Sequence, residues 1–163
     1  MRNSMANICL MGAALLTASC ASSAQKNDVP DQITQESIEG FYELGELERQ
    51  QLDAGDCGLF LFAARPEPRF VFFSEAGKGT AKVVLNGKPT VFARSSTEGD
   101  VLDLHYTEQV FHSPVENVEL KVTINEAVPG DGGSQITKAS IRISDSAGWK
   151  MVIPVGGATS CVG

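Results

Sequence analysis

The chain has 163 residues, of which 42% are hydrophobic and 20% are charged, and its formal net charge is −7. This length suits one domain around one hydrophobic core, and the composition argues against a wholly disordered chain. The acidic balance and the dispersal of Lys78, Lys82 and Lys88 exclude nucleic acid as an expected partner, because phosphate binding needs clustered cations.

The first 24 residues read MRNSMANICLMGAALLTASCASSA, with one basic residue, an apolar stretch from Ile8 to Leu16 and then small residues. This order is typical of a signal peptide. The apolar stretch is too short for a permanent membrane span, which needs about 20 residues. We therefore expect an exported protein.

The end of the signal peptide has two candidate positions. Thr17-Ala18-Ser19-Cys20 resembles the lipobox of bacterial lipoproteins, although Leu is commoner where Thr17 stands. The resemblance implies cleavage after residue 19, acylation of Cys20 and a domain held on the membrane, facing the periplasm. The alternative is ordinary cleavage after Ala24, which would give a soluble periplasmic protein.

The mature chain begins with a polar stretch, residues 20–36, which we interpret as a flexible tether. A single domain is expected over residues 37–163. Its first part, residues 37–54, favours a short helix, because Phe41, Leu44, Leu47 and Leu52 approximate one face and Gly55 could end it.

From Cys57 onward, apolar runs alternate with turn signals. The Asn86-Gly87 pair predicts a tight hairpin, and residues 116–125 alternate apolar and polar side chains as a half-buried strand does. Short connections favour about eight antiparallel strands in a small barrel, with a two-layer sandwich as the alternative. The expected strands cover residues 57–64, 69–75, 79–85, 90–95, 100–111 (one longer strand or two), 116–125, 135–144 and 147–155.

The cysteines indicate one disulfide. Cys9 is lost with the signal peptide and Cys20 is acylated or lost, so Cys57 and Cys161 remain as a pair in an oxidising compartment. A bond between them would join the first strand to the end of the last, which favours a barrel. Neither cysteine has a CxxC partner or a nearby His, so a metal or redox site is not expected.

The two histidines do not define a metal or catalytic centre. His105 and His112 are seven residues apart, so on one strand they would point to opposite faces, even with Glu108 as a third candidate ligand. We expect His105 on a strand surface and His112 in a loop. The stretch 95–99 is interpreted as a turn.

Other motifs are equally unspecific. No GxSxG elbow is present, and residues 129–133 lack the Lys and the context of a phosphate loop. The carboxylates of Asp100 and Asp103 would face opposite ways, as would those of Glu116 and Glu119. No catalytic residue, cofactor or metal is therefore predicted.

The phenylalanines are the one feature that suggests more than a core. They differ in parity, so some must project from the face opposite the others. Either both faces of these strands are covered, or one set lines a small apolar cavity or an exposed patch that binds a ligand or partner. The residues are Phe60, Phe62, Phe70, Phe72, Phe73 and Phe92.

Residues 57–161 resemble small uncharacterised envelope proteins of Gram-negative bacteria that start with a CGLFL-type strand and end in a cysteine. That resemblance implies no activity. A fainter similarity is to the lipoprotein inhibitors of c-type lysozyme, with Ser95, Ser96, Gly99 and Tyr106 as the corresponding Ser/Gly turn and Tyr. The span between cysteines is longer here and a clear SxSGxxY motif is lacking, so inhibitory residues are not carried over.

Three functional hypotheses follow. The first is a non-enzymatic lipoprotein of the cell envelope that binds a protein partner or a small apolar ligand. The second is an inhibitor of an extracellular hydrolase such as lysozyme. The third is an enzyme that uses His105 or His112.

Overall fold

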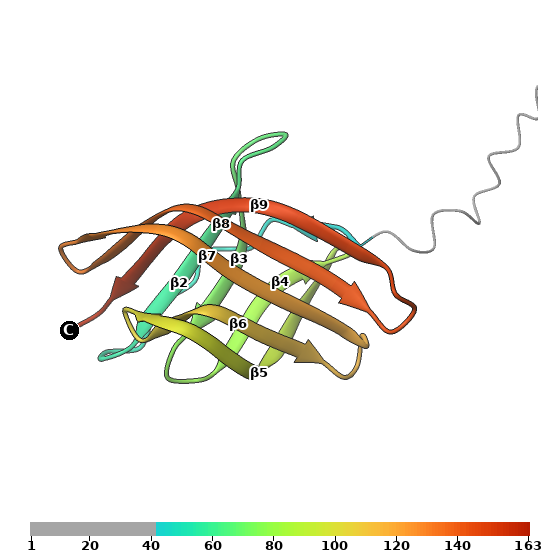
Figure 1. The fold of residues 1–163 in the computed structure, drawn as a ribbon, viewed down its shortest axis with the longest axis horizontal. Helices are drawn as coiled ribbons and strands as arrows, with labels where there is room; N and C mark the ends of the chain where they lie inside the picture. Colours follow the sequence, from blue (N-terminus) through green and yellow to red (C-terminus); the bar gives the residue numbers. More distant parts are fainter. Residues whose placement is uncertain (1–41) are drawn as a thin grey trace, which may run out of the picture. The chain divides into compact units, whose positions relative to one another are not determined.

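A computed structural model of the protein describes residues 42–163 as a closed barrel of eight antiparallel strands with one short additional strand (Figure 1). Each barrel strand pairs with the next along the chain, and β9 pairs back with β2. The predicted barrel is confirmed over the sandwich. The strands are β1 (Leu44–Gly45), β2 (Cys57–Ala63), β3 (Arg69–Glu75), β4 (Thr80–Leu85), β5 (Lys88–Leu102), β6 (His105–Ser113), β7 (Val118–Gly130), β8 (Gly133–Asp145) and β9 (Lys150–Cys161).

The barrel has two ends. The ends of β2 and β9 that carry Cys57 and Cys161 lie with the β3–β4, β5–β6 and β7–β8 turns, and we call this the closed end. The other four connections lie at the opposite end, where the described chain begins, and we call it the Tyr42 end. No helix in the described part of the chain is long and apolar enough to span a membrane.

The barrel interior is filled by the inward side chains of all eight strands. Val118, Leu120 and Val122 alternate with outward residues along β7, as the sequence predicts. Phe72 and Phe111 meet edge to face in the interior, with ring centroids 5.6 Å apart, and both are fully buried. Burial of side chains this large contributes about 2–3 kcal/mol each, so the interior is a packed core.

The expected short helix is wrong for residues 42–54. Residues 42–56, here named the N-terminal strap, contain no helix, end in a turn at residues 54–55 and contribute β1, which pairs with β4 through Leu44 and Leu85. Residues 37–41 of the expected helix lie outside the described residues.

The strap is not helical because it fills a gap in the barrel wall. β3 pairs with β4 only through Phe73–Glu75, and the strap continues the wall beyond that point, where the Leu47 N–H donates to the Phe70 carbonyl at 2.7 Å. Gly45 allows the close approach, since a Cβ there would lie 2.8 Å from Val84. A helix could not offer its backbone to both neighbouring strands.

The expected turn at residues 95–99 is also wrong. β5 runs without a break from Lys88 to Leu102 and contains two register irregularities, between Arg94 and Ser96 and between Glu98 and Val101. Gly99 lies in the second one with a φ of 81°, a backbone conformation that glycine adopts without strain. Bulges therefore replace the turn and let a 15-residue strand bend around the barrel.

Two hairpins have two-residue turns with positive φ at both positions. Asn86 and Gly87 form the predicted turn, with φ of 49° and 75°. Residues 100–111, expected as one longer strand or two, are divided by a second such turn at Asp103 and Leu104, with φ of 46° and 65°. Leucine is a poor residue for this conformation, so no sequence signal marked the turn.

Candidate functional site

The predicted disulfide is present and fastens the closed end. Cys57 and Cys161 are direct partners in the β2–β9 register, and their Cα atoms are 4.1 Å apart. The bond spans 104 residues of sequence, from the first barrel strand to the last. Cys20, the predicted acylation site, lies outside the described residues.

The two histidines point to opposite sides of the barrel wall, as predicted. His105 is fully buried at the closed end, so its expected place on the strand surface is wrong. His112 is exposed on the outer face of β6 instead of in a loop. Among residues 42–163, no group of three His, Cys, Asp or Glu side chains could hold a metal ion.

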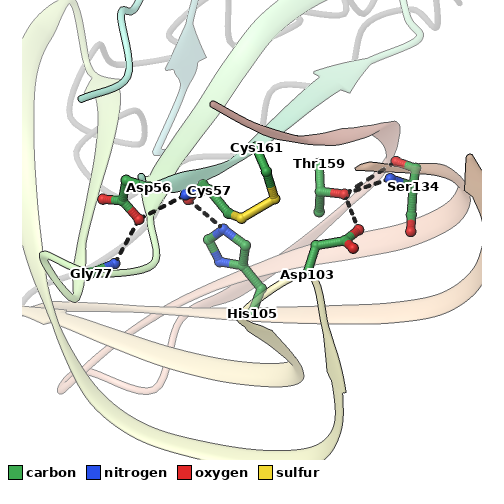
Figure 2. Close-up of a disulfide and its surroundings, with 8 residues drawn as sticks. All are labelled: Asp56, Cys57, Gly77, Asp103, His105, Ser134, Thr159 and Cys161. Carbon is green, nitrogen blue, oxygen red and sulfur yellow. Dashed lines mark hydrogen bonds between the residues drawn. A yellow bond between two sulfur atoms is a disulfide. The ribbon is translucent and has the colours of Figure 1, made fainter. Parts of the chain in front are cut away.

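His105 caps the interior by reaching across the barrel to β2. Its Nε2–H donates to the carbonyl of Cys57 at 3.1 Å (Figure 2). The N–H of Ala76 donates to the same oxygen at 3.0 Å. Burial lowers the pKa of His105, against the opposing effect of the Cys57 carbonyl. The imidazole is therefore neutral near pH 7 and serves as a structural cap.

Asp103 forms a second fastening at the same end. The hydroxyl of Thr159 donates to Asp103 at 2.5 Å and accepts from the N–H of Ser134 at 2.7 Å, so the β5–β6 turn is tied to β8 and β9 (Figure 2). The Thr159 and Ser134 contacts lower the pKa of the Asp103 carboxyl. Asp100 is exposed and has no part in this network, so the two carboxylates are not an acid–base pair.

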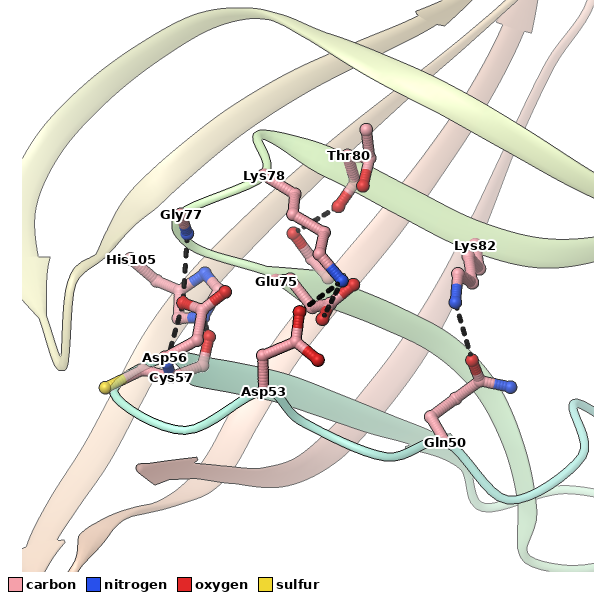
Figure 3. A network of polar contacts seen from close by, with 11 residues as sticks. Gln50, Asp53, Asp56, Cys57, Glu75, Gly77, Lys78, Thr80, Lys82 and His105 are labelled. Atoms are coloured by element: carbon pink, nitrogen blue, oxygen red, sulfur yellow. Dashed lines mark hydrogen bonds and ion pairs between the residues drawn. The ribbon is translucent and has the colours of Figure 1, made fainter. Parts of the chain in front are cut away.

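The strap is fastened to the β3–β4 turn by charged side chains (Figure 3). Asp56 accepts from the N–H groups of Cys57 and Gly77 at 2.8 and 3.0 Å. Lys78 lies 2.8 Å from the buried carboxylate of Glu75 and 3.0 Å from Asp53, and these two carboxylates raise its pKa. These contacts tie the strap to the β3–β4 turn, whereas the Nδ1 atom of the buried His105 has no hydrogen-bond partner within the described residues.

The phenylalanines form two sets, as their parity predicts. Phe72 and Phe92 face the core and are fully buried. The others form an outer phenylalanine row on β2 and β3, with neighbouring centroids 5.0 Å (Phe73–Phe60), 5.9 Å (Phe60–Phe70) and 5.2 Å (Phe70–Phe62) apart.

The outer phenylalanine row is covered at one end and open at the other. Phe73, toward the closed end, is 1% exposed beneath the strap, and Lys82 lies 5.5 Å from its ring centroid. Phe62, at the Tyr42 end, is 42% exposed. The sequence-based alternative of full coverage is wrong for Phe62, and an exposed patch is present.

The surroundings of Phe62 extend this patch. Its register partner on β9 is Gly156, which has no side chain to cover the ring, and the same outer face of β9 carries Pro154 and the 56% exposed Val152. Beside it, the β2–β3 loop (residues 64–68) contains two prolines, is exposed throughout and stands out from the barrel (Figure 1). The result is an apolar surface flanked by a projecting loop.

The residues that carried the similarity to lysozyme inhibitors lie within strands. Ser95, Ser96 and Gly99 belong to β5, and Tyr106 belongs to β6. The Ser95 hydroxyl donates to the carbonyl of Val110 across the β5–β6 pair. These four residues therefore do not form a projecting turn.

Comparisons with known proteins give this barrel no relatives. No protein-family model matches the sequence, and no match was found among curated proteins or among solved structures. Function must therefore be argued from the site itself.

Proposed function

We propose that the protein is a non-enzymatic lipoprotein of the cell envelope that binds a protein partner through the exposed end of its outer phenylalanine row. The observation that carries the proposal is the 42% exposure of Phe62, opposite Gly156 in the register and next to the projecting β2–β3 loop. An exposed aromatic surface of this kind favours recognition, because aromatic side chains supply large contact area at low entropic cost.

A protein partner is better supported than a small apolar ligand. A small ligand would need a cavity, yet the barrel interior is occupied by core side chains, including Phe72, Phe92 and Phe111, which are fully buried. The surface around Phe62 is apolar along β9 and is flanked by the exposed β2–β3 loop, features that fit another macromolecular surface.

Site-specific photocrosslinking in cells tests this proposal. A photoreactive phenylalanine analogue at position 62 should yield one reproducible protein adduct, identified by mass spectrometry. The same analogue at Val101, which is 62% exposed on β5, is the matched control and should yield no such adduct. The proposal fails if position 62 gives no adduct or the same adducts as position 101.

Membrane anchoring through Cys20 is a separate part of the proposal. It is supported by the signal peptide and the lipobox-like Thr17-Ala18-Ser19-Cys20 sequence. The intact mass of the mature protein should show a chain that starts at an acylated Cys20, with processing sensitive to globomycin. An unmodified chain that starts at Gln25 would make it a soluble periplasmic protein.

Inhibition of an extracellular hydrolase is a second candidate, supported by the loop of residues 64–68. An exposed loop with two prolines on a disulfide-closed barrel has a form that could enter an enzyme cleft. Micromolar protein should then inhibit one member of a lysozyme panel, and replacing residues 64–68 by a Gly-Ser linker should abolish the effect. The absence of inhibition across the panel would remove this candidate.

A further inference from the structure

A polar groove of about 420 Å³ lies on the outer wall of β6–β9 at the Tyr42 end. Its wall is built from outward-facing side chains of neighbouring strands and of the turns that follow them. The groove is lined by His112, Asn117, Glu119, Lys121, Arg142, Ser144, Asp145, Ser146 and Lys150.

The groove gathers cations in a protein whose net charge is −7. Lys121 and Arg142 are direct cross-strand partners in the β7–β8 register, an arrangement of like charges that is unfavourable by itself. Lys150 lies opposite Ser144, two residues along β8 from Arg142. Lys121 is paired with Glu108 at 2.6 Å, but Arg142 and Lys150 form no ion pair within the described residues.

The acidic side chains of the groove leave these cations available. Asp145 already accepts from the Tyr42 hydroxyl at 3.2 Å and from the Trp149 N–H at 3.0 Å. Glu119 on β7 pairs in the register with His112 on β6 and Ser144 on β8, and it forms no ion pair within the described residues. In that part of the chain, the groove cations without an ion-pair partner are thus the Arg142 guanidinium and the Lys150 ammonium.

We propose that this groove binds a phosphate oxyanion, presented by the head group of an anionic phospholipid. The planar guanidinium of Arg142 can donate two parallel hydrogen bonds to phosphate oxygens, and Lys150 adds a second charge. Binding would also relieve the repulsion between Arg142 and Lys121.

The chain's own course supports a lipid as the source of the phosphate. Tyr42, the first described residue, is hydrogen-bonded to Asp145 in the groove lining, so the described part of the chain begins at this groove. Cys20 precedes Tyr42 by 22 residues, a reach of at most about 75 Å when fully extended. This choice of source rests on the proposed membrane anchoring.

Binding can be measured on the full chain in maltoside micelles by the NMR signal of the Arg142 Nε–H group. Micelles doped with phosphatidylglycerol should shift this signal saturably, whereas phosphatidylcholine should leave it nearly unchanged. Inorganic phosphate serves as the soluble probe and should bind more weakly. Added salt should reduce every one of these affinities, since the interaction is electrostatic.

Three variants test the role of each charge, with the phosphatidylglycerol affinity read from the protein's other amide signals. Arg142→Gln should weaken binding about tenfold, the value of one charge-assisted hydrogen bond. Glu119→Gln should strengthen it, because a nearby repulsive charge is removed. Lys138→Gln is the matched control, since Lys138 is an outward cation of β8 outside the groove, paired with Glu126 at 3.4 Å, and it should leave binding unchanged.

The outcomes separate the possible sources. Saturation by inorganic phosphate without any response to phosphatidylglycerol would support an oxyanion site but refute a phospholipid as its ligand. No shift with either probe, or equal affinity in Arg142→Gln, would overturn the site itself. The micelle measurement does not depend on acylation of Cys20, so failure of the proposed anchoring would be seen separately in the mass of the mature chain.

Discussion

The two ends of the barrel are built in contrasting ways. At the closed end, the Cys57–Cys161 bond, the buried His105 and the Asp103–Thr159 contact fasten strands that are distant in sequence. At the Tyr42 end, by contrast, the side chains of Phe62 and Val115 are 42% and 87% exposed. The closed end therefore carries many of the contacts that hold distant strands together. The side chains at the Tyr42 end are then available for binding.

Removing the disulfide should have the largest effect on this contrast. Replacing Cys57 and Cys161 together by Ala should lower the free energy of unfolding by about 4–5 kcal/mol, the value for a closed loop of about 100 residues. Urea unfolding followed by circular dichroism measures the change. A loss below about 1 kcal/mol would mean that His105 and Asp103 hold the closed end without the covalent bond.

The outer phenylalanine row allows a Phe→Ala substitution near the closed end of the barrel to be compared with one at the Tyr42 end. Phe73→Ala should cost about 3–4 kcal/mol of unfolding free energy, because the ring is buried under the strap. Phe62→Ala should cost less than about 1 kcal/mol, because the ring is half in solvent already. Equal losses in urea unfolding would contradict the description of Phe62 as an available binding residue.

The sequence predicted those features that depend on local pattern. Alternation of Val118, Leu120 and Val122 identified β7, the Asn86-Gly87 pair identified a hairpin, and cysteine parity identified the disulfide. Strand alternation showed that His105 and His112 face opposite ways. It could not show which of them faces inward, because that depends on how the sheet closes.

The strap could not be predicted for a related reason. Leu44, Leu47 and Leu52 have a spacing that fits a helix, and only the gap between β3 and β4 makes a non-helical chain the better solution. The exposure gradient along the outer phenylalanine row depends on the strap, so the candidate site was visible from sequence only as a set of phenylalanines on two faces.

The pH dependence of stability should report on the closed end. Burial lowers the pKa of His105 below the value of about 6.5 that it has in the unfolded chain. As the pH falls below about 6.5, the unfolded chain takes up a proton first, so the free energy of unfolding declines until the pH reaches the folded pKa. Above about pH 6.5, His105 is neutral in both the folded and the unfolded state, and its contribution to the free energy of unfolding is fully present.

Two glutamine variants separate this effect from other titrations. His105→Gln should remove the decline between pH 6.5 and 5, although it lowers stability at every pH by loss of the cap. His112→Gln makes the same chemical change on the exposed outer face and should keep the decline. Urea unfolding at a series of pH values provides the comparison, and parallel curves for wild type and His105→Gln would exclude His105 as its source.

The smallest expected effects on the free energy of unfolding concern the two hairpin turns, one at each end of the barrel. The two substitutions should change it in opposite directions. Leu104 is 59% exposed and holds a φ of 65°, a strained conformation for leucine, so Leu104→Gly should raise the unfolding free energy by about 1 kcal/mol. Gly87 has a φ of 75° with no atom near its missing Cβ, so Gly87→Ala should lower stability by about 1 kcal/mol through backbone strain alone. If Leu104→Gly is instead destabilising, the side chain of Leu104 must make contacts that outweigh its strain. In that case the closed end is held by the turn itself as well as by Asp103, His105 and the disulfide.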